Sequence, residues 1–148
     1  MDRLDILILQ ATIRDLKHNP NACTATMIGR SSVDGEPILR SVPDQQLRDF
    51  IEYLYKQNFI DIRYLLNYEK VKHQTIDEID AQGAMTCITW IIRGDLFSSG
   101  LLYECVKDGT FGALLEKLFQ LVVKDRVARI AQQQAQANIT GQYQAPAV

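Results

Sequence analysis

The chain has 148 residues, of which 47% are hydrophobic and 23% are charged, a length and composition typical of one globular domain. Its formal net charge of −2 disfavours duplex DNA as a partner, because DNA-binding proteins gain much of their affinity from Lys and Arg side chains at phosphates. No apolar run approaches the roughly 20 residues that cross a bilayer. The N-terminus carries Asp2 and Asp5 and lacks a cleavage site of small residues, so it is not a secretory signal. We therefore expect a cytoplasmic protein that does not enter a membrane.

Three cysteines, an odd number, are spread along the chain as Cys23, Cys87 and Cys105. Each is flanked by apolar or small residues, a setting typical of buried free thiols in a reducing compartment. We therefore expect unpaired cysteines rather than a disulfide framework.

The first predicted elements are a helix over residues 3–18 and a β-rich segment over residues 22–42. Apolar residues of the helix recur at steps of three and four, and the expected buried face consists of Leu4, Leu7, Ile8, Ala11 and Leu16. Pro20 stops this helix, because proline cannot continue it. The β-rich segment contains a turn at residues 32–35, where Gly35 tolerates positive φ. It predicts a short hairpin or two short strands.

A second helix is predicted over residues 43–58. Ser41 or Asp44 can cap it, and Pro43 suits a first turn, where its missing N–H is not needed. Asn58 is expected to end the helix in the left-handed conformation, so that the chain folds back onto the core. The expected buried stripe includes Leu47, Phe50, Ile51 and Leu54.

An antiparallel pair of strands is predicted next, over residues 61–72 and 84–92. Both segments show the alternation of a strand; in the second, Ile88 and Trp90 share a face. The connection 73–83 is too long for a tight turn. Its Thr75-Ile76-Asp77-Glu78 run resembles a capping box, so we expect a helical turn at the tip.

Two further helices are predicted, over residues 95–107 and 111–130. The second has a long apolar stripe that comprises Phe111, Leu114, Leu115, Leu118, Phe119, Val122, Val123, Val127 and Ile130. The last eighteen residues contain six Gln and little to bury. We therefore expect one domain over residues 1–130 and a Gln/Ala-rich flexible tail over residues 131–148.

The sequence contains no recognisable catalytic, cofactor or metal motif. It has no Gly-rich phosphate loop, no nucleophile elbow and no spaced set of zinc ligands. His18 and His73 lie in different segments without an evident partner and are expected to be solvated. The acidic cluster of Asp77, Glu78 and Asp80 lacks the alternate oxygen ligands of a calcium loop. We therefore predict a protein that is not an enzyme and uses no cofactor and no metal.

Aromatic residues concentrate in the middle of the chain, as Tyr53, Tyr55, Tyr64, Tyr68 and Trp90. Such residues stack on nucleic-acid bases in some proteins and pack elements together in most. Packing is favoured for Tyr64 and Trp90, whereas both roles stay open for Tyr53 and Tyr55.

The order of helix, β-rich segment, helix, hairpin and C-terminal helix resembles a winged-helix domain. The run Leu54–Ile60 (LYKQNFI) is similar to the helix-ending turn, and Ile88–Phe97 (ITWIIRGDLF) to the Thr-Trp signature of the second hairpin strand, in a winged-helix-like family of small bacterial and phage proteins of unknown function. Asp95 stands at the position of the signature His. The resemblance spans about residues 3–120. It implies an α+β fold with a β-hairpin wing and a long C-terminal amphipathic helix, and an accessory role in a phage or mobile element.

Two functions from different classes fit this expected fold. In a DNA-binding transcriptional regulator, helix 43–58 would enter a groove while the wing touches the backbone. The reading surface would be Gln45, Arg48, Glu52 and Lys56, and the wing residues would be Arg63, Lys70 and Lys72. The helix carries two positive and three negative charges, which is a poor footprint for duplex DNA.

The second function is a protein-interaction or oligomerisation module. Here the C-terminal helix pairs with a second copy through Leu115, Leu118 and Val122, although the same stripe could instead complete the core of one protomer. The partner would be another protein or the same protein in a homodimer. We favour this function over DNA binding, and both over an enzyme.

Overall fold

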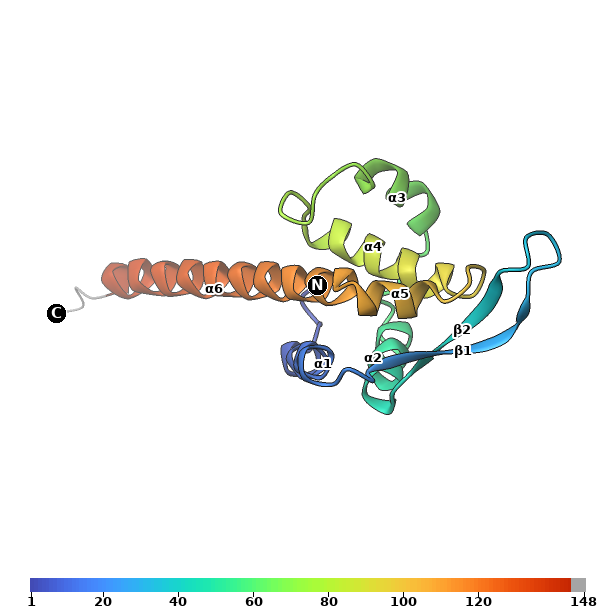
Figure 1. The fold of residues 1–148 in the computed structure, drawn as a ribbon. Coiled ribbons are helices and arrows are strands. Elements are labelled where there is room, and N and C mark those ends of the chain that lie inside the picture. Colours follow the sequence, from blue (N-terminus) through green and yellow to red (C-terminus); the bar gives the residue numbers. More distant parts are fainter. Residues whose placement is uncertain (145–148) are drawn as a thin grey trace.

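The computed structural model describes the backbone of residues 1–144 and the side chains of residues 1–139. Within this part of the chain it shows six α-helices and one antiparallel pair of strands (Figure 1). In chain order the elements are α1 Ile6–His18, β1 Cys23–Arg30, β2 Pro37–Pro43, α2 Gln45–Lys56, α3 Tyr64–Val71, α4 Ala81–Gly94, α5 Leu101–Lys107 and α6 Thr110–Gln144. The predicted α+β class, with a hairpin and a long C-terminal helix, is confirmed.

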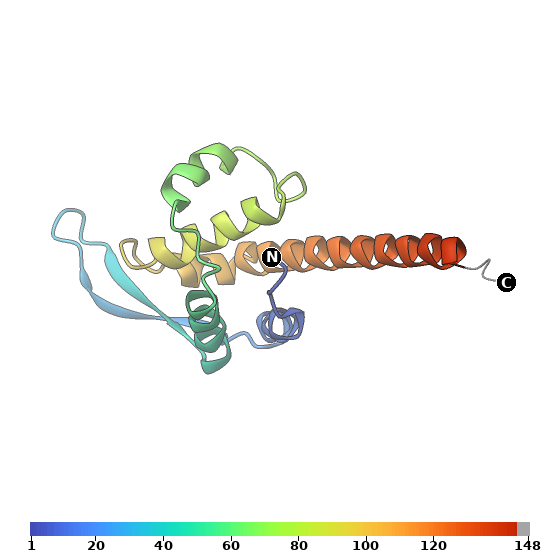
Figure 2. The ribbon, with the colours of Figure 1, turned by 180° about the vertical axis from the view of Figure 1, so that it is seen from behind.

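Helix α6 is the axis of the fold. Its first half packs between α4 on one side and α1 on the other, with α5 near its beginning (Figures 1 and 2). Phe111, Leu115 and Leu118 of this half are fully buried. The hydrophobic core therefore lies around the first half of α6, and the second half extends away from the body.

Helix α1 begins after the cap residue Asp5, whose carboxylate accepts hydrogen bonds from the N–H groups of Leu7 and Ile8 at 2.9 and 3.3 Å. The predicted helix is confirmed, but its predicted buried face is partly wrong. Leu9 and Thr12 are fully buried, whereas Leu7 is 71% exposed. Helix α1 packs against both α2 and α6. The positions of these two helices therefore determine which residues of α1 are buried.

Strands β1 and β2 form the hairpin predicted within residues 22–42, with Cys23 opposite Pro43 and Arg30 opposite Pro37. The hairpin projects from the body at the end opposite to the free part of α6 (Figure 1).

Strand β2 is tied to the start of α5 through one carboxylate. Ser41 Oγ donates a hydrogen bond to Asp95 Oδ1 at 2.7 Å, and the N–H of Leu102 donates to the same oxygen at 2.8 Å. Gly100 has a φ of 64°, and a Cβ there would lie 3.1 Å from Leu39 Cβ. Glycine is therefore needed where the hairpin meets the helical body.

Helix α2 confirms the predicted helix and both of its end signals. The Asp44 carboxylate accepts a hydrogen bond from the N–H of Leu47 at 2.8 Å. At the other end Asn58 has a φ of 58°, and the N–H of Phe59 donates to the carbonyl of Leu54 at 2.9 Å. This left-handed turn directs the chain back toward the core.

The antiparallel strand pair predicted over residues 61–72 and 84–92 is wrong, because both segments are helical, as α3 and α4. Helix α4 buries most of its residues: Gly83, Ala84, Met85, Thr86, Ile88, Thr89, Ile91 and Ile92. A helix covered on several sides is apolar all round, and its β-branched residues give it the composition of a strand. The hairpin found within residues 1–144 precedes α2, and no hairpin wing follows that helix there.

The C-terminal helices differ from the prediction at two boundaries. Helix α5 begins at Leu101, because residues 95–100 form turns after α4. Helix α6 continues beyond the predicted end at residue 130, so that residues 131–144, expected to be a flexible tail, are helical. The rest of the expected tail, residues 145–148, lies outside the described residues. Among the described helices, none combines the length and apolarity needed to span a membrane.

Asp61 joins α3 to α4. Its carboxylate accepts hydrogen bonds from Asn67 Nδ2 at 2.9 Å, from Thr86 Oγ1 at 2.8 Å and from the N–H of Arg63 at 2.9 Å. Its own N–H donates to Thr89 Oγ1 at 3.1 Å. Burial raises the pKa of this carboxyl, but the hydrogen bonds to it outweigh burial and hold the pKa below its usual range.

Replacing Asp61 by Ala is expected to lower the free energy of unfolding by about 3 kcal/mol, because the buried Thr86 hydroxyl loses its acceptor. Since the pKa of Asp61 is depressed in the folded state, ionised Asp61 stabilises the fold above the ordinary aspartate pKa of about 3.9. This stabilisation is lost as the pH falls below that value. Urea unfolding at neutral and at acidic pH measures both effects. The exposed Glu78→Gln variant is the control, and an Asp61→Ala variant as stable as wild type at neutral pH would contradict the prediction.

Candidate functional site

The distal segment of α6, residues 127–144, leaves the body of the protein (Figures 1 and 2). Every side chain from Val127 to Ile139 is exposed. Val127 and Ile130 are 61% and 53% exposed, and with Gln134 and Ala137 they follow the alternating steps of three and four of a coiled-coil seam. Val127 and Ile130 thus continue the apolar stripe of α6 for about one turn beyond the part that the chain itself covers.

The root of this segment is fixed to the N-terminus of the chain. The Arg126 guanidinium donates hydrogen bonds to the carbonyl oxygens of Met1, Asp2 and Leu4. Arg129 forms ion pairs with Asp2 and with Asp125. The hydrogen bond from Arg129 and its charge hold the pKa of the Asp2 carboxyl below its usual range. Polar contacts therefore hold the N-terminus of the chain against α6 at the point where the helix leaves the body.

The residues predicted to form a dimer helix lie before this root. Leu115 and Leu118 are 0% exposed and Val122 is 4% exposed, because they pack into the core of the same protomer. The apolar stripe that was expected to pair with a second copy is thus buried in the core of its own protomer. This is the alternative that the sequence analysis left open. A longer helix is not predicted from the sequence, because the Gln-rich composition of residues 131–148 favours a flexible tail.

The residues predicted to read DNA all lie on the exposed side of α2: Gln45, Arg48, Glu52 and Lys56. Lys56 Nζ lies 2.9 Å from Glu52 Oε1, and the Arg48 guanidinium donates to Gln45 Oε1 at 3.2 Å. Gln45 also donates to Asp49 Oδ1 at 2.7 Å. Both cations of this surface are therefore engaged by neighbours on the same helix.

The predicted wing residues do not lie on a wing. Lys70 lies on α3, Arg63 precedes its first turn and Lys72 follows its last. Lys72 forms an ion pair with Glu69 at 2.6 Å. The prediction that these three cations line a β-hairpin is therefore wrong, because the segment that carries them forms α3, which Asp61 joins to α4.

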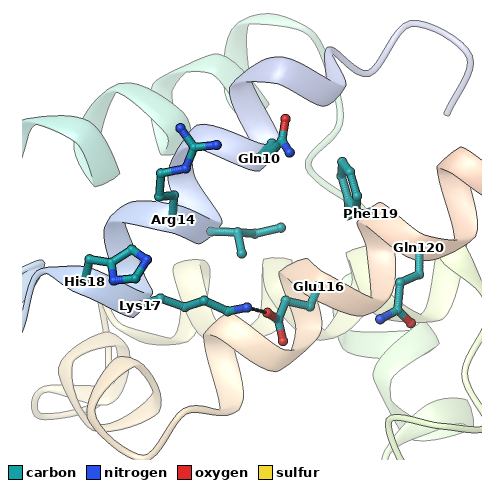
Figure 3. Close-up of a pocket in the computed structure, with 8 residues that line it drawn as sticks. Gln10, Arg14, Lys17, His18, Glu116, Phe119 and Gln120 are labelled. Carbon is teal, nitrogen blue, oxygen red and sulfur yellow. Dashed lines mark ion pairs between the residues drawn. The ribbon is translucent and has the colours of Figure 1, made fainter.

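A groove lies between α1 and α6, with a volume of about 420 Å³. Helix α1 contributes Gln10, Ile13, Arg14, Lys17 and His18, and α6 contributes Glu116, Phe119 and Gln120. Figure 3 shows the two sets of side chains on facing helices, with the ion pair of Lys17 and Glu116 spanning the gap. Sequence reasoning did not find this groove, because its walls are far apart in the chain and no motif links them.

Residues 2–124 match the family of unknown function DUF6508. The chain belongs to this family. The resemblance predicted a family of unknown function, and at that level the expectation is confirmed. No curated protein and no solved structure matches the chain. The matched residues of this DUF6508 protein include the groove between α1 and α6 and end just before the distal segment.

The aromatic residues of this DUF6508 protein connect its helices. The rings of Tyr68 and Trp90 stack between α3 and α4 with centroids 4.5 Å apart. The Arg93 guanidinium lies 5.8 Å from the centre of the Tyr64 ring, and the Tyr53 hydroxyl accepts a hydrogen bond from the N–H of Asp5 at 2.8 Å. The packing role expected for Tyr64 and Trp90 is thus confirmed, although they pack two helices rather than two strands.

The cysteines are unpaired, as predicted. Burial raises the pKa of the Cys23 and Cys105 thiols to about 11 and also raises the pKa of Cys87. These thiols are therefore protonated at neutral pH and poorly suited to act as nucleophiles. Within the described residues, no group of three or more His, Cys, Asp and Glu side chains could hold a metal ion.

Two carboxyl groups meet where α1 ends and α2 begins. Asn19 Nδ2 donates to Asp44 Oδ2 at 3.0 Å and to Asp15 Oδ1 at 3.4 Å. Asp15 Oδ2 is buried and accepts no hydrogen bond. Burial raises the pKa of Asp15, and the neighbouring Asp44 raises it further. An ionised Asp15 is therefore an unfavourable contact at this junction.

Replacing Asp15 by Asn is expected to raise the free energy of unfolding at neutral pH by about 1 kcal/mol, because the amide can donate where the carboxylate cannot. Since the folded pKa of Asp15 is raised, the folded state is favoured at acidic pH and loses this advantage as the pH rises through that pKa. The increase in the free energy of unfolding from Asp15→Asn should thus be absent well below the ordinary aspartate pKa of about 3.9, where Asp15 is neutral in both states. Thermal unfolding across the acidic range tests this against Glu104→Gln, and a destabilised Asp15→Asn variant at neutral pH would refute it.

Proposed function

We propose that this protein is a non-enzymatic interaction module that forms a homodimer through the distal segment of α6. The observation that carries the proposal is the exposed apolar edge of that segment, which projects beyond the body on a continuous helix. The partner is a second copy of the chain, and the contact is helix against helix around Val127 and Ile130.

The stability of an isolated helix supports a partner for this segment. Most of the stability of helices in proteins comes from packing one face against a neighbour. This segment, whose described side chains are all exposed, has no such neighbour within the described part of its own protomer. Residues 130–144 contain no charged side chain, so ion pairs between successive turns cannot stabilise them. Packing of the apolar edge against another helix supplies the missing stabilisation.

The absence of charge also favours a second copy over a charged partner. Two identical neutral segments lie side by side without like-charge repulsion, and a two-fold axis makes the same edge serve both protomers. Gln134 interrupts the apolar seam, and a buried polar residue at such a position fixes the register of paired helices. Ala137 on the seam and Ala131 beside it are small enough to let the helices approach closely.

Duplex DNA binding is the alternative function, carried by α2. It is less well supported, because Lys56 and Arg48 are engaged on that helix and the chain has a net charge of −2. A titration of random duplex DNA at low salt tests it, since the phosphate contribution is strongest there. An accessory role in a phage or mobile element and a cytoplasmic location are further hypotheses, whereas the winged-helix hypothesis is not retained, because α3 and α4 occupy the segment predicted as its wing.

Light scattering after size-exclusion chromatography tests the dimer. The full chain is expected to have about twice its protomer mass of 16.8 kDa, and a Val127→Glu/Ile130→Glu variant is expected to be a monomer, because two buried charges oppose pairing. The far-ultraviolet circular dichroism of this variant should show less helix, since the unpaired segment unfolds.

The matched control is Ala128→Glu/Gln132→Glu, which adds the same two charges to the opposite, exposed side of the same helix. It should stay dimeric. A full chain that is monomeric across the accessible concentration range would refute the proposal, and so would a control variant that dissociates as fully as the seam variant.

A further inference from the structure

We infer that the groove between α1 and α6 is a binding site for a small amphipathic organic anion, with an apolar body and one acidic head such as a carboxylate or sulfonate. The inference is independent of the proposed dimer, because the groove precedes the root of the distal segment. Ile13, Phe119 and Arg14 are the residues on which it depends.

The size of the groove fits such a ligand, and two apolar side chains lie within its otherwise polar lining. Small-molecule sites in proteins occupy about 300–1,000 Å³ and are mainly apolar, with a few polar groups that orient the ligand. This groove has a volume of about 420 Å³. Its apolar surface comes from Ile13 on α1 and the half-buried Phe119 ring on α6.

The apolar surface continues beyond the ion pair of Lys17 and Glu116. A second hollow of about 180 Å³ shares Ile13 and both ion-pair residues with the groove. Leu16 and Val106 also line it. An apolar ring or short chain therefore has room to lie along the two helices.

The charges at the rim select an anionic head. Arg14 and Lys17 outnumber Glu116, so the groove has a net charge of +1 on a chain whose net charge is −2. Figure 3 shows Arg14 pointing away from the ion pair. Arg14 is exposed and makes no hydrogen bond or ion pair with the described residues, so its donors are available to a ligand.

The backbone of α1 does not help to bind this head. The groove lies beside the last turns of α1, where the helix dipole places a partial negative charge of about one half. The side chains must therefore hold the anion, and Arg14 presents a planar set of donors that matches a carboxylate or sulfonate. Removal of the Arg14 side chain should therefore weaken binding of the anion strongly.

The test uses 1-anilinonaphthalene-8-sulfonate, a fluorescent probe with an apolar body and a sulfonate head, on the full chain. Saturable binding to the wild type is expected, with a dissociation constant that rises about tenfold in Arg14→Gln. Arg48→Gln, which removes an exposed arginine on α2 outside the groove, is the matched control and should bind as the wild type does.

A second variant, Phe119→Leu, keeps the apolar volume and removes the ring, and it should also weaken binding. Thermal unfolding of each variant shows whether the fold is retained. Decanoate should displace the probe, whereas inorganic phosphate, which has a head but no apolar body, should not. Absence of saturable binding, or equal binding by wild type, Arg14→Gln and Phe119→Leu, would overturn the inference, because the probe would then bind elsewhere on the chain or not at all.

Discussion

The burial of the first half of α6 by the preceding helices is the interaction on which the rest of the structure depends. Phe111, Leu115 and Leu118 are fully buried, and each such side chain contributes roughly 2 kcal/mol or more when removed from water. Helices α1, α4 and α5 all pack against this half of the helix. Helix α3 has no buried residue and is held by other means, through the hydrogen bonds of Asp61 and the stacking of Tyr68 on Trp90.

The same helix produces both candidate surfaces, by two different geometric effects. The groove exists because α1 and α6 face each other without closing, so that Ile13 and Phe119 line a hollow instead of packing tightly. The distal segment exists because α6 is longer than the body that covers it. Arg126 lies between the two regions, where it donates hydrogen bonds to backbone carbonyl groups at the N-terminus. The proposed ligand and the proposed second copy would therefore contact separate parts of α6.

Much of the acidic character of the chain serves its architecture. Asp5, Asp44 and Asp80 cap α1, α2 and α4, while Asp61 and Asp95 join elements that are distant in the sequence. A carboxylate that accepts N–H groups is held in place by the fold and is less available to a partner. Local sets such as Arg14 with Lys17 therefore add to what the net charge of the chain indicates about its partners.

The sequence by itself determined the features that depend on local chemistry: the hairpin, the N-terminal cap of α2, the left-handed turn at Asn58 and the apolar first half of α6. Only the tertiary structure decided that the segment containing Trp90 is helical, because burial on several sides removes the periodicity that separates a helix from a strand. It also decided that Leu118 serves the protomer's own core. The groove required both helices at once, because Arg14 and Phe119 become neighbours only when the chain has folded.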